Sequence, residues 1–211
     1  HMAVYGNFVA LGDNEQAIHV YDWFNGGVKL STFKPSVSSW MLSSICLANN
    51  KQLFACYDAM MTGSFIIEID VATGANLRHV GEHSAFRMIA KDNILFSVGA
   101  FMVKMYDMKT LQCNVLADMD GVNVGAAVHG NLIALAKQNY VNIVNFVTNQ
   151  DLVRIDDTHG ENMRNQIFLS ATHVAVAEKG GSIKFFDLQS KQLLNEESFG
   201  NLEAFAVVQY Q

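Results

Sequence analysis

The chain has 211 residues, of which 50% are hydrophobic and 16% charged, so it can bury a core and is not typical of a disordered protein. Its formal net charge of −6 argues against a nucleic-acid partner, since a nucleic-acid groove needs a dense basic face. No apolar run approaches the roughly 18 residues that a membrane helix needs, so no membrane partner is expected.

The three cysteines and the first residues indicate a cellular setting. Cys46, Cys56 and Cys113 form no Cys-x-x-Cys pair, which is typical of reduced thiols in a cytoplasmic protein. His1-Met2 is typical of a cloning remnant, and no charged-then-apolar signal segment follows it. Because Ala3–Tyr5 already lies close to a strand, we expect a domain that belongs to a larger multidomain protein.

An alternating apolar strand that ends in Asp or Asn occurs five times along the chain. We call its last residue the closing residue. The closing residues are 48, 37, 38 and 42 positions apart, a period typical of a β-propeller. The five strands are Ala17–Asp22, Phe65–Asp70, Met102–Asp107, Tyr140–Asn145 and Ser182–Asp187.

Each repeat is predicted to form one four-stranded blade. The second repeat shows this best, with Trp40–Leu47, Leu53–Tyr57, the strand that ends at Asp70, and Asn76–Val80. Second strands are nearly continuous runs of small apolar residues, as expected where both faces of a strand are buried. The predicted boundaries are 38–82 for blade 2, 84–119 for blade 3, 121–158 for blade 4 and 161–199 for blade 5.

The two ends of the chain are predicted to share blade 1. The N-terminal repeat supplies strands at Phe8–Leu11, up to Asp22, and at Val28–Phe33, whereas the tail Leu202–Tyr210 supplies one strand. The 24 residues after Asp187 and the 22 residues up to Asp22 together make 46, which lies within the range of the repeat. The sequence therefore predicts a single all-β domain over 3–211. It is a five-bladed β-propeller closed by pairing 3–33 with 201–211, which leaves no open sheet edge.

The closing dipeptides resemble those of the WD-repeat superfamily, whose third strands often end in Trp-Asp. They read Tyr-Asp at 21–22 and 106–107, Ile-Asp at 69–70, Phe-Asp at 186–187 and Val-Asn at 144–145. The usual Gly-His element is absent. Because most propellers of that superfamily have seven blades, a fragment of a seven-bladed propeller is the structural alternative.

Most candidate chemical motifs have a structural interpretation. The closing aspartates are expected to cap tight turns rather than to catalyse, because they recur at one position of every repeat. The oxygen-rich stretches Asp118–Gly121 and Asp156–Glu161 lack the ligand spacing of a calcium loop. His79 and His83 are interpreted as exposed polar residues. We therefore predict no metal and no cofactor.

The loops are where the repeats differ from one another. In the superfamily that the chain resembles, one face carries the second-to-third and the blade-to-blade loops. Mapped here, those loops hold nine of the twenty acidic residues against three lysines, whereas the opposite face carries four lysines with only Asp92. An acidic face attracts a basic peptide. Trp40 can serve as an aromatic anchor, or it can equally begin the core contacts of its strand. The predicted binding residues are Asp13, Trp40, Asp58, Glu82, Asp118, Asp120, Asp157, Glu161 and Glu178.

Two functions are compatible with this pattern. The first is a non-enzymatic protein–protein interaction module, a scaffold or adaptor that binds a protein or peptide through its loops. The alternative is a small lectin or a glycosidase-like domain, in which Asp58, Asp118 and Asp157 would converge, since a glycosidase needs two carboxylates about 5–10 Å apart. The first is favoured because no loop is long enough to build a deep substrate pocket and no aromatic site repeats in the loops.

Overall fold

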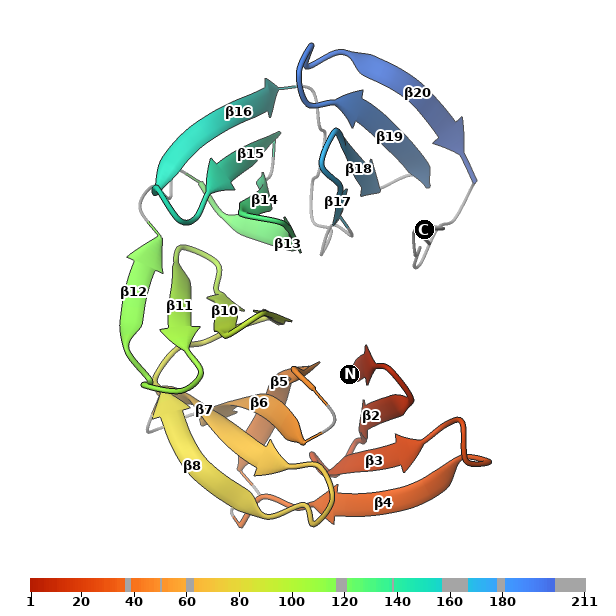
Figure 1. Cartoon of the computed structure of the whole chain (residues 1–211), viewed down its shortest axis with the longest axis vertical. Coiled ribbons are helices and arrows are strands. Elements are labelled where there is room, and N and C mark those ends of the chain that lie inside the picture. Colours follow the sequence, from red (N-terminus) through yellow and green to blue (C-terminus); the bar gives the residue numbers. More distant parts are fainter. Residues whose placement is uncertain are drawn as a thin grey trace. The chain divides into compact units, whose positions relative to one another are not determined.

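The computed structural model describes residues 1–36, 39–49, 51–59, 63–116, 121–137, 139–156, 167–177 and 181–199. These residues form twenty strands and no helix, arranged as five four-stranded antiparallel sheets (Figure 1). In each sheet the strands follow one another in chain order. The predicted all-β class, the number of blades and the number of strands per blade are confirmed.

The chain divides into two compact units. Unit 1 comprises His1–Gly99 and Val103–Val115, and unit 2 comprises Ala100–Met102 and Leu116–Gln211. The strands of unit 1 are β1 (Met2–Tyr5), β2 (Phe8–Gly12), β3 (Ile18–Asp22) and β4 (Val28–Phe33) in sheet 1; β5 (Trp40–Leu47), β6 (Gln52–Ala59), β7 (Gly63–Asp70) and β8 (Asn76–Gly81) in sheet 2; and β9 (Arg87–Lys91), β10 (Ile94–Val98), β11 (Val103–Asp107) and β12 (Cys113–Leu116) in sheet 3.

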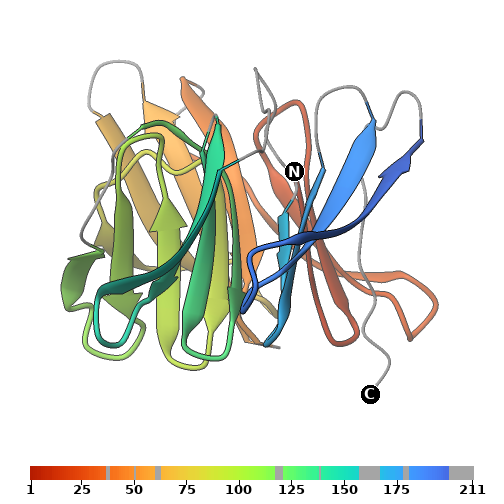
Figure 2. The ribbon, with the colours of Figure 1, turned by 90° about the horizontal axis from the view of Figure 1, so that it is seen from above.

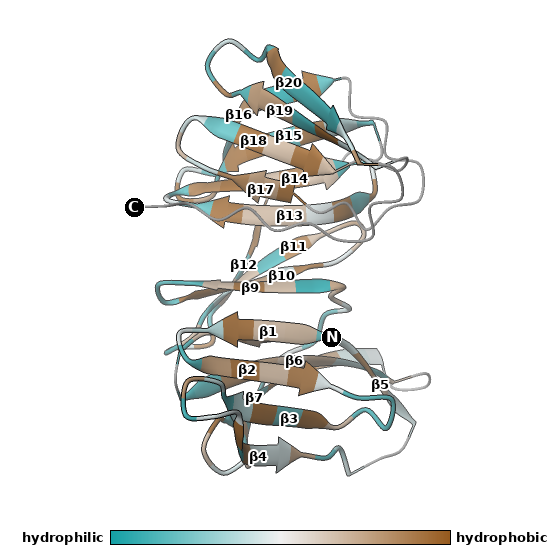
Figure 3. Cartoon of the chain, turned by 90° about the vertical axis from the view of Figure 1, so that its right-hand side faces the viewer, coloured by the Kyte–Doolittle hydropathy of each residue, from teal (hydrophilic) through white to brown (hydrophobic). Residues whose placement is uncertain are grey.

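Unit 2 contains the other two sheets. Its strands are β13 (Asn123–His129), β14 (Leu132–Lys137), β15 (Tyr140–Asn145) and β16 (Gln150–Asp156) in sheet 4, and β17 (Ile167–Leu169), β18 (His173–Ala177), β19 (Ser182–Asp187) and β20 (Leu193–Ser198) in sheet 5. In Figure 3 hydrophobic residues are concentrated in the strands, whereas β20 and many turns are hydrophilic.

The first sheet differs from the sequence expectation. Its first strand is β1, formed by Met2–Tyr5 and paired with β2 from Met2↔Leu11 to Tyr5↔Phe8. A tight turn at Gly6, whose φ is +53°, joins the two strands. The expectation that the N-terminal repeat begins at its second strand was therefore wrong. With Met2 assigned to a cloning remnant, the remaining apolar run Ala3–Tyr5 is too short to be recognised as a strand. Residues 201–211, expected to complete this blade, lie outside the described residues.

The middle strands carry the core because both of their faces are buried. In β6, Leu53, Ala55 and Tyr57 pack in a cluster with sheet 1, whereas Phe54 and Cys56 pack in a cluster with sheet 3. All five side chains are fully buried. In unit 2, Ala134 and Ala136 of β14 likewise pack with Val174 and Val176 of β18. The prediction that second strands are buried on both faces is confirmed for β6, β10, β14 and β18, whereas in β2 only Ala10 is fully buried and Leu11 is 38% exposed.

A β-bulge recurs where the third and fourth strands of a sheet pair. In sheets 1, 2, 4 and 5, the register shifts directly after the third-strand residue that lies two positions before the closing residue. The extra residue in the fourth strand is a leucine each time, and sequence reasoning overlooked this repeated signal. Each of these leucines is partly exposed: Leu30, Leu77, Leu152 and Leu194.

Gly74 is expected to be indispensable for the packing of sheet 2 against sheet 1. Its φ is +72°, and a Cβ at this position would lie 2.6 Å from the carbonyl oxygen of Thr32, a backbone atom of β4. Gly74→Ala should therefore lower the free energy of unfolding by roughly 2–4 kcal/mol, through left-handed strain and a backbone clash.

The matched control is Gly26→Ala, because Gly26 has φ +76° but open space around its Cβ position. In urea unfolding, Gly26→Ala should lower the free energy of unfolding only by the left-handed strain, about 1–2 kcal/mol. Equal losses in both variants would show that the contact with Thr32 has no energetic role.

Candidate functional site

The antiparallel order gives each sheet two different ends (Figure 2). The first-to-second and third-to-fourth turns lie at one end, which we call the turn end. The second-to-third connections and the connections between sheets lie at the other, the loop end. Four of the predicted binding residues are described, and Asp13, Trp40, Asp58 and Glu82 belong to loop-end segments. The other five lie outside the described residues: Asp118, Asp120, Asp157, Glu161 and Glu178.

Asp13 has a structural role at the loop end of sheet 1. Its Oδ1 accepts hydrogen bonds from the backbone N–H groups of Glu15 and Ala17, each at 2.9 Å, and its Oδ2 lies 2.7 Å from His19 Nε2. The hydrogen bond with His19 is the main reason that the pKa of Asp13 lies below its usual value. The carboxylate therefore orders its own loop.

Trp40 packs on the core at the start of β5. Its ring meets that of Phe65 edge-on, with the centroids 4.4 Å apart, and lies 6.1 Å from that of Tyr57. The side chain is half-buried and packs against the cluster between sheets 1 and 2. The sequence could not distinguish the two roles, since either one places an aromatic residue at the start of a strand.

Asp58 and Glu82 are the predicted acids that remain available at the loop end of unit 1. Asp58 is half-buried near the end of β6, and its Oδ1 is shielded from solvent without a hydrogen-bond partner. Glu82 follows β8 and is exposed, and its backbone carbonyl accepts a hydrogen bond of 2.8 Å from Lys104 Nζ. No described contact neutralises either carboxylate.

The closing residues are turn caps, as expected. Asp107 Oδ1 accepts the backbone N–H groups of Lys109 and Thr110, at 2.9 and 2.7 Å, and the Thr110 hydroxyl. Asp187 does the same with Gln189 and Ser190. These hydrogen bonds, the one from the backbone of Thr110 or Ser190 foremost, hold the pKa of each carboxyl below its usual range.

The hydroxyl three residues after the closing residue is a signal that sequence reasoning overlooked. Thr73, Thr110 and Ser190 each donate a hydrogen bond from the side chain to the closing aspartate. Because the caps lie at the turn end, that end carries Asp22, Asp70, Asp107 and Asp187 besides Asp92. The expectation of a turn end with four lysines and only Asp92 was therefore wrong, and the charge contrast between the two ends is smaller than it first appears.

His83 differs from the exposed residue that the sequence suggested. It is half-buried at the entrance to sheet 3, and its Nδ1 lies 2.6 Å from the hydroxyl of the fully buried Ser97. Its carbonyl accepts a hydrogen bond from Cys56 Sγ at 3.2 Å. Burial lowers the pKa of His83 to about 4, so the ring is neutral at pH 7. Its partners come from other strands, so no local pattern reveals this role.

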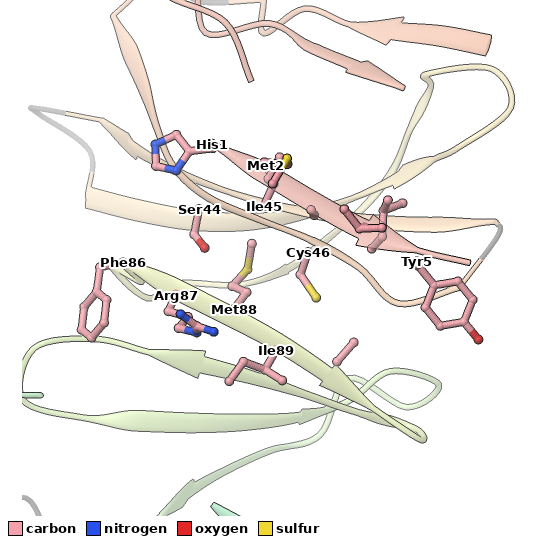
Figure 4. Close-up of a pocket in the computed structure, with 14 residues that line it drawn as sticks. His1, Met2, Tyr5, Ser44, Ile45, Cys46, Phe86, Arg87, Met88 and Ile89 are labelled. Carbon is pink, nitrogen blue, oxygen red and sulfur yellow. The ribbon is translucent and has the colours of Figure 1, made fainter. Parts of the chain in front are cut away.

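A cavity of unit 1 lies among the first strands of its three sheets, with a volume of about 480 Å³. Figure 4 shows Ser44 and Cys46 projecting from β5 toward β9, which contributes Arg87 and Met88. Burial raises the pKa of Cys46 to about 11, so its thiol is protonated and weakly nucleophilic at neutral pH. The cavity has polar groups but lacks an activated nucleophile among its described lining residues.

Neither a metal centre nor a membrane span is found in the described part of the chain. Its His, Cys, Asp and Glu side chains form no group of three or more that could hold a metal ion. The same residues include no helix long and apolar enough to cross a membrane.

Comparisons with known proteins bear on the fold alone. No protein-family model and no curated protein matches the chain. The chain is similar to the crystal structure of the computationally designed Ika8 protein, with 22% identity and a TM-score of 0.70 over 93% of this chain. It is also similar to the crystal structure of BamB from Moraxella catarrhalis, with 12% identity and a TM-score of 0.65 over 95% of this chain.

Both of these structures are β-propellers, and with the five four-stranded sheets they show that this chain has a β-propeller fold. The chain covers 60% of the length of the designed protein and 64% of that of BamB. At these identities the likeness carries no function.

The depressed pKa of His83 predicts acid sensitivity. In the unfolded chain a histidine titrates near pH 6.5, whereas in the folded chain His83 titrates at about 4. Between these values only the unfolded state takes up the proton. The free energy of unfolding should therefore fall by about 2 kcal/mol between pH 7 and pH 4.5.

Urea unfolding should show that the free energy of unfolding changes less between pH 7 and pH 4.5 for His83→Gln than for the wild-type chain. NMR titration of the His83 ring in the folded protein gives an independent measurement. A midpoint near the ordinary histidine value would contradict the burial that the structure shows.

Proposed function

We propose that the chain is a non-enzymatic protein–protein interaction module, a scaffold or adaptor that binds a protein or peptide partner through its loop end. The observation that carries the proposal is a fixed loop surface next to acidic groups that the fold leaves unused. The fold is compatible with this role, since propellers present many loops on a rigid core.

Cross-sheet hydrogen bonds fix the loop end of unit 1. The hydroxyl of the buried Tyr57 donates to the backbone carbonyl of Gln16 at 2.9 Å, and Gln16 Oε1 accepts the backbone N–H of Leu42 at 2.6 Å. The loop of sheet 1 is thereby tied to two strands of sheet 2. A surface ordered before binding loses less conformational entropy when a partner arrives.

Asp58 and Glu82 supply the acidic character. Asp58 is half-buried, so water screens the attraction between its carboxylate and a cation of a partner less than at a fully exposed group. Glu82 is exposed and adds attraction at longer range. A basic peptide or a basic protein surface fits this pair.

A non-enzymatic role is supported by what the perturbed groups do. Asp13 and His19 hydrogen-bond to each other, His83 is tied to Ser97, and the Cys46 thiol is protonated. Each of these described groups has a structural role, which supports the proposal of a non-enzymatic function.

The test is affinity capture of cellular partners by three forms of the chain: wild type, Asp58→Asn with Glu82→Gln, and a control with Asp92→Asn and Glu196→Gln. The control removes the same charge away from the loop end. Partners held through the loop end should be retained by the control and lost or weakened about tenfold with the first variant, as expected when a charge-assisted hydrogen bond is removed.

Association rates of a captured partner, measured at two salt concentrations, add a second readout. The wild-type rate should fall with salt, and the loop-end variant should lose most of that dependence. Identical partners and rates for all three proteins would overturn the role of the loop end.

A further inference from the structure

One repeated position between neighbouring sheets is filled differently in the two units. It involves the residue directly after each closing residue, which is Val71 in sheet 2, Met108 in sheet 3 and Leu188 in sheet 5. In unit 1 the carbonyl of this residue accepts a hydrogen bond from the fourth strand of the preceding sheet. Ser31 Oγ donates to the Val71 carbonyl at 2.6 Å, and Arg78 Nη2 donates to the Met108 carbonyl.

The bulge identifies the equivalent donor position in sheets 1, 2, 4 and 5. Ser31 lies opposite Val20, and Arg78 lies opposite Glu68, in each case directly after the extra leucine of the fourth strand. In sheet 4 the residue at this position is Val153, opposite Ile143. Valine has no donor, and no described residue donates a hydrogen bond to the Leu188 carbonyl.

A groove lies at this position in unit 2. Its volume is about 310 Å³, and its apolar wall is made by Leu132, Ile143, Leu152, Val153 and Leu188. The bulge leucine Leu152 is 48% exposed, which leaves part of this wall open to solvent. The groove is deep enough for an aliphatic side chain.

An acidic group borders the groove. The closing residue Asp187 is one of the lining residues, and only its Oδ1 takes part in the turn cap. In sheet 3 the second oxygen of Asp107 accepts Asn93 Nδ2 at 2.6 Å. The residue equivalent to Asn93 is Thr172, whose hydroxyl instead lies 2.7 Å from His173 Nδ1. Asp187 Oδ2 therefore has no hydrogen-bond partner among the described residues.

Arg78 shows which side chain this position accommodates. Its Nε donates to the buried Glu68 at 2.6 Å while its Nη2 donates to the Met108 carbonyl of the next sheet. One arginine thus fills the space between sheets 2 and 3 and satisfies a carboxylate and a carbonyl together. The groove in unit 2 offers the same two kinds of acceptor beside an apolar wall, without the arginine.

We propose that this groove binds an arginine side chain of a partner peptide. The aliphatic part of the arginine packs on Ile143, Val153 and Leu188, and its guanidinium donates to the Leu188 carbonyl and to Asp187. Arginine fits better than lysine because its planar, multi-donor head reaches two acceptors at once. The net charge of −6 favours a basic partner. This inference rests on the proposed interaction function and adds a second contact, at the turn end.

The test uses the full chain and three capped Gly-Ala peptides that differ only in a central Arg, Lys or citrulline. NMR amide shifts in β16, β18 and the Asp187 turn report binding at the groove. The arginine peptide should bind about tenfold more tightly than the citrulline peptide, since citrulline keeps the shape but loses the charge. Lysine should lie between the two.

Two variants and one control locate the contact. Val153→Arg places an arginine of the chain itself in the groove, as Arg78 does between sheets 2 and 3, and should abolish peptide binding without lowering the unfolding midpoint. Asp187→Asn keeps the cap oxygen and should weaken binding about tenfold. Asp70→Asn, the same change at the closing residue of sheet 2, should leave binding unchanged.

Two results would overturn the inference: no groove shifts with the arginine peptide at low-millimolar concentration, or equal binding by wild type and Val153→Arg. Partner capture separates this failure from failure of the proposed function. If the loop-end variant loses its partners while Val153→Arg keeps them, the interaction role holds and the groove is not a contact.

Discussion

Burial of the middle strands on both faces is the constraint on which the rest of the structure depends. Leu53, Ala55 and Tyr57 of β6 are buried toward sheet 1, and Phe54 and Cys56 toward sheet 3, so sheet 2 is sandwiched between its neighbours. A single four-stranded sheet of this composition would expose two apolar faces to water. The repeats are therefore stable only side by side, and a side chain that crosses between them has effects in two sheets.

That constraint explains why the repeats vary where they do. The core positions keep the same apolar character, whereas the donor position after the extra leucine changes from Ser31 to Arg78 to Val153. The first two make polar links to the next sheet, and the third leaves a groove. Differences among otherwise equivalent contacts thus indicate where the chain has surface available for another molecule.

The sequence predicted the features that arise from local chemistry. The alternating strands and the caps at Asp70, Asp107 and Asp187 depend on residues within a few positions of one another, and these local patterns recur along the chain. It missed β1, whose four residues are too few to show a period.

The side-chain roles that the sequence did not resolve depend on contacts between distant segments. The hydrogen bond of His83 with Ser97 and the packing of Trp40 on Phe65 join separate strands, and no pattern within one strand encodes them. The candidate binding residues also depend on contacts that local patterns do not reveal. Local reasoning could place Asp13 in a loop, but only the folded chain shows that its carboxylate is occupied by His19 and two backbone groups.

The three cysteines also differ in their environments. Cys46 and Cys56 are buried and burial raises the pKa of both thiols, whereas Cys113 on β12 is exposed. Thiol reagents act on exposed thiolates. Maleimide dyes or spin labels should thus attach at Cys113 alone in the native chain, which provides one spectroscopic reporter in unit 1 without any engineered substitution. A second cysteine introduced in unit 2 would then allow the distance between the two units to be measured directly.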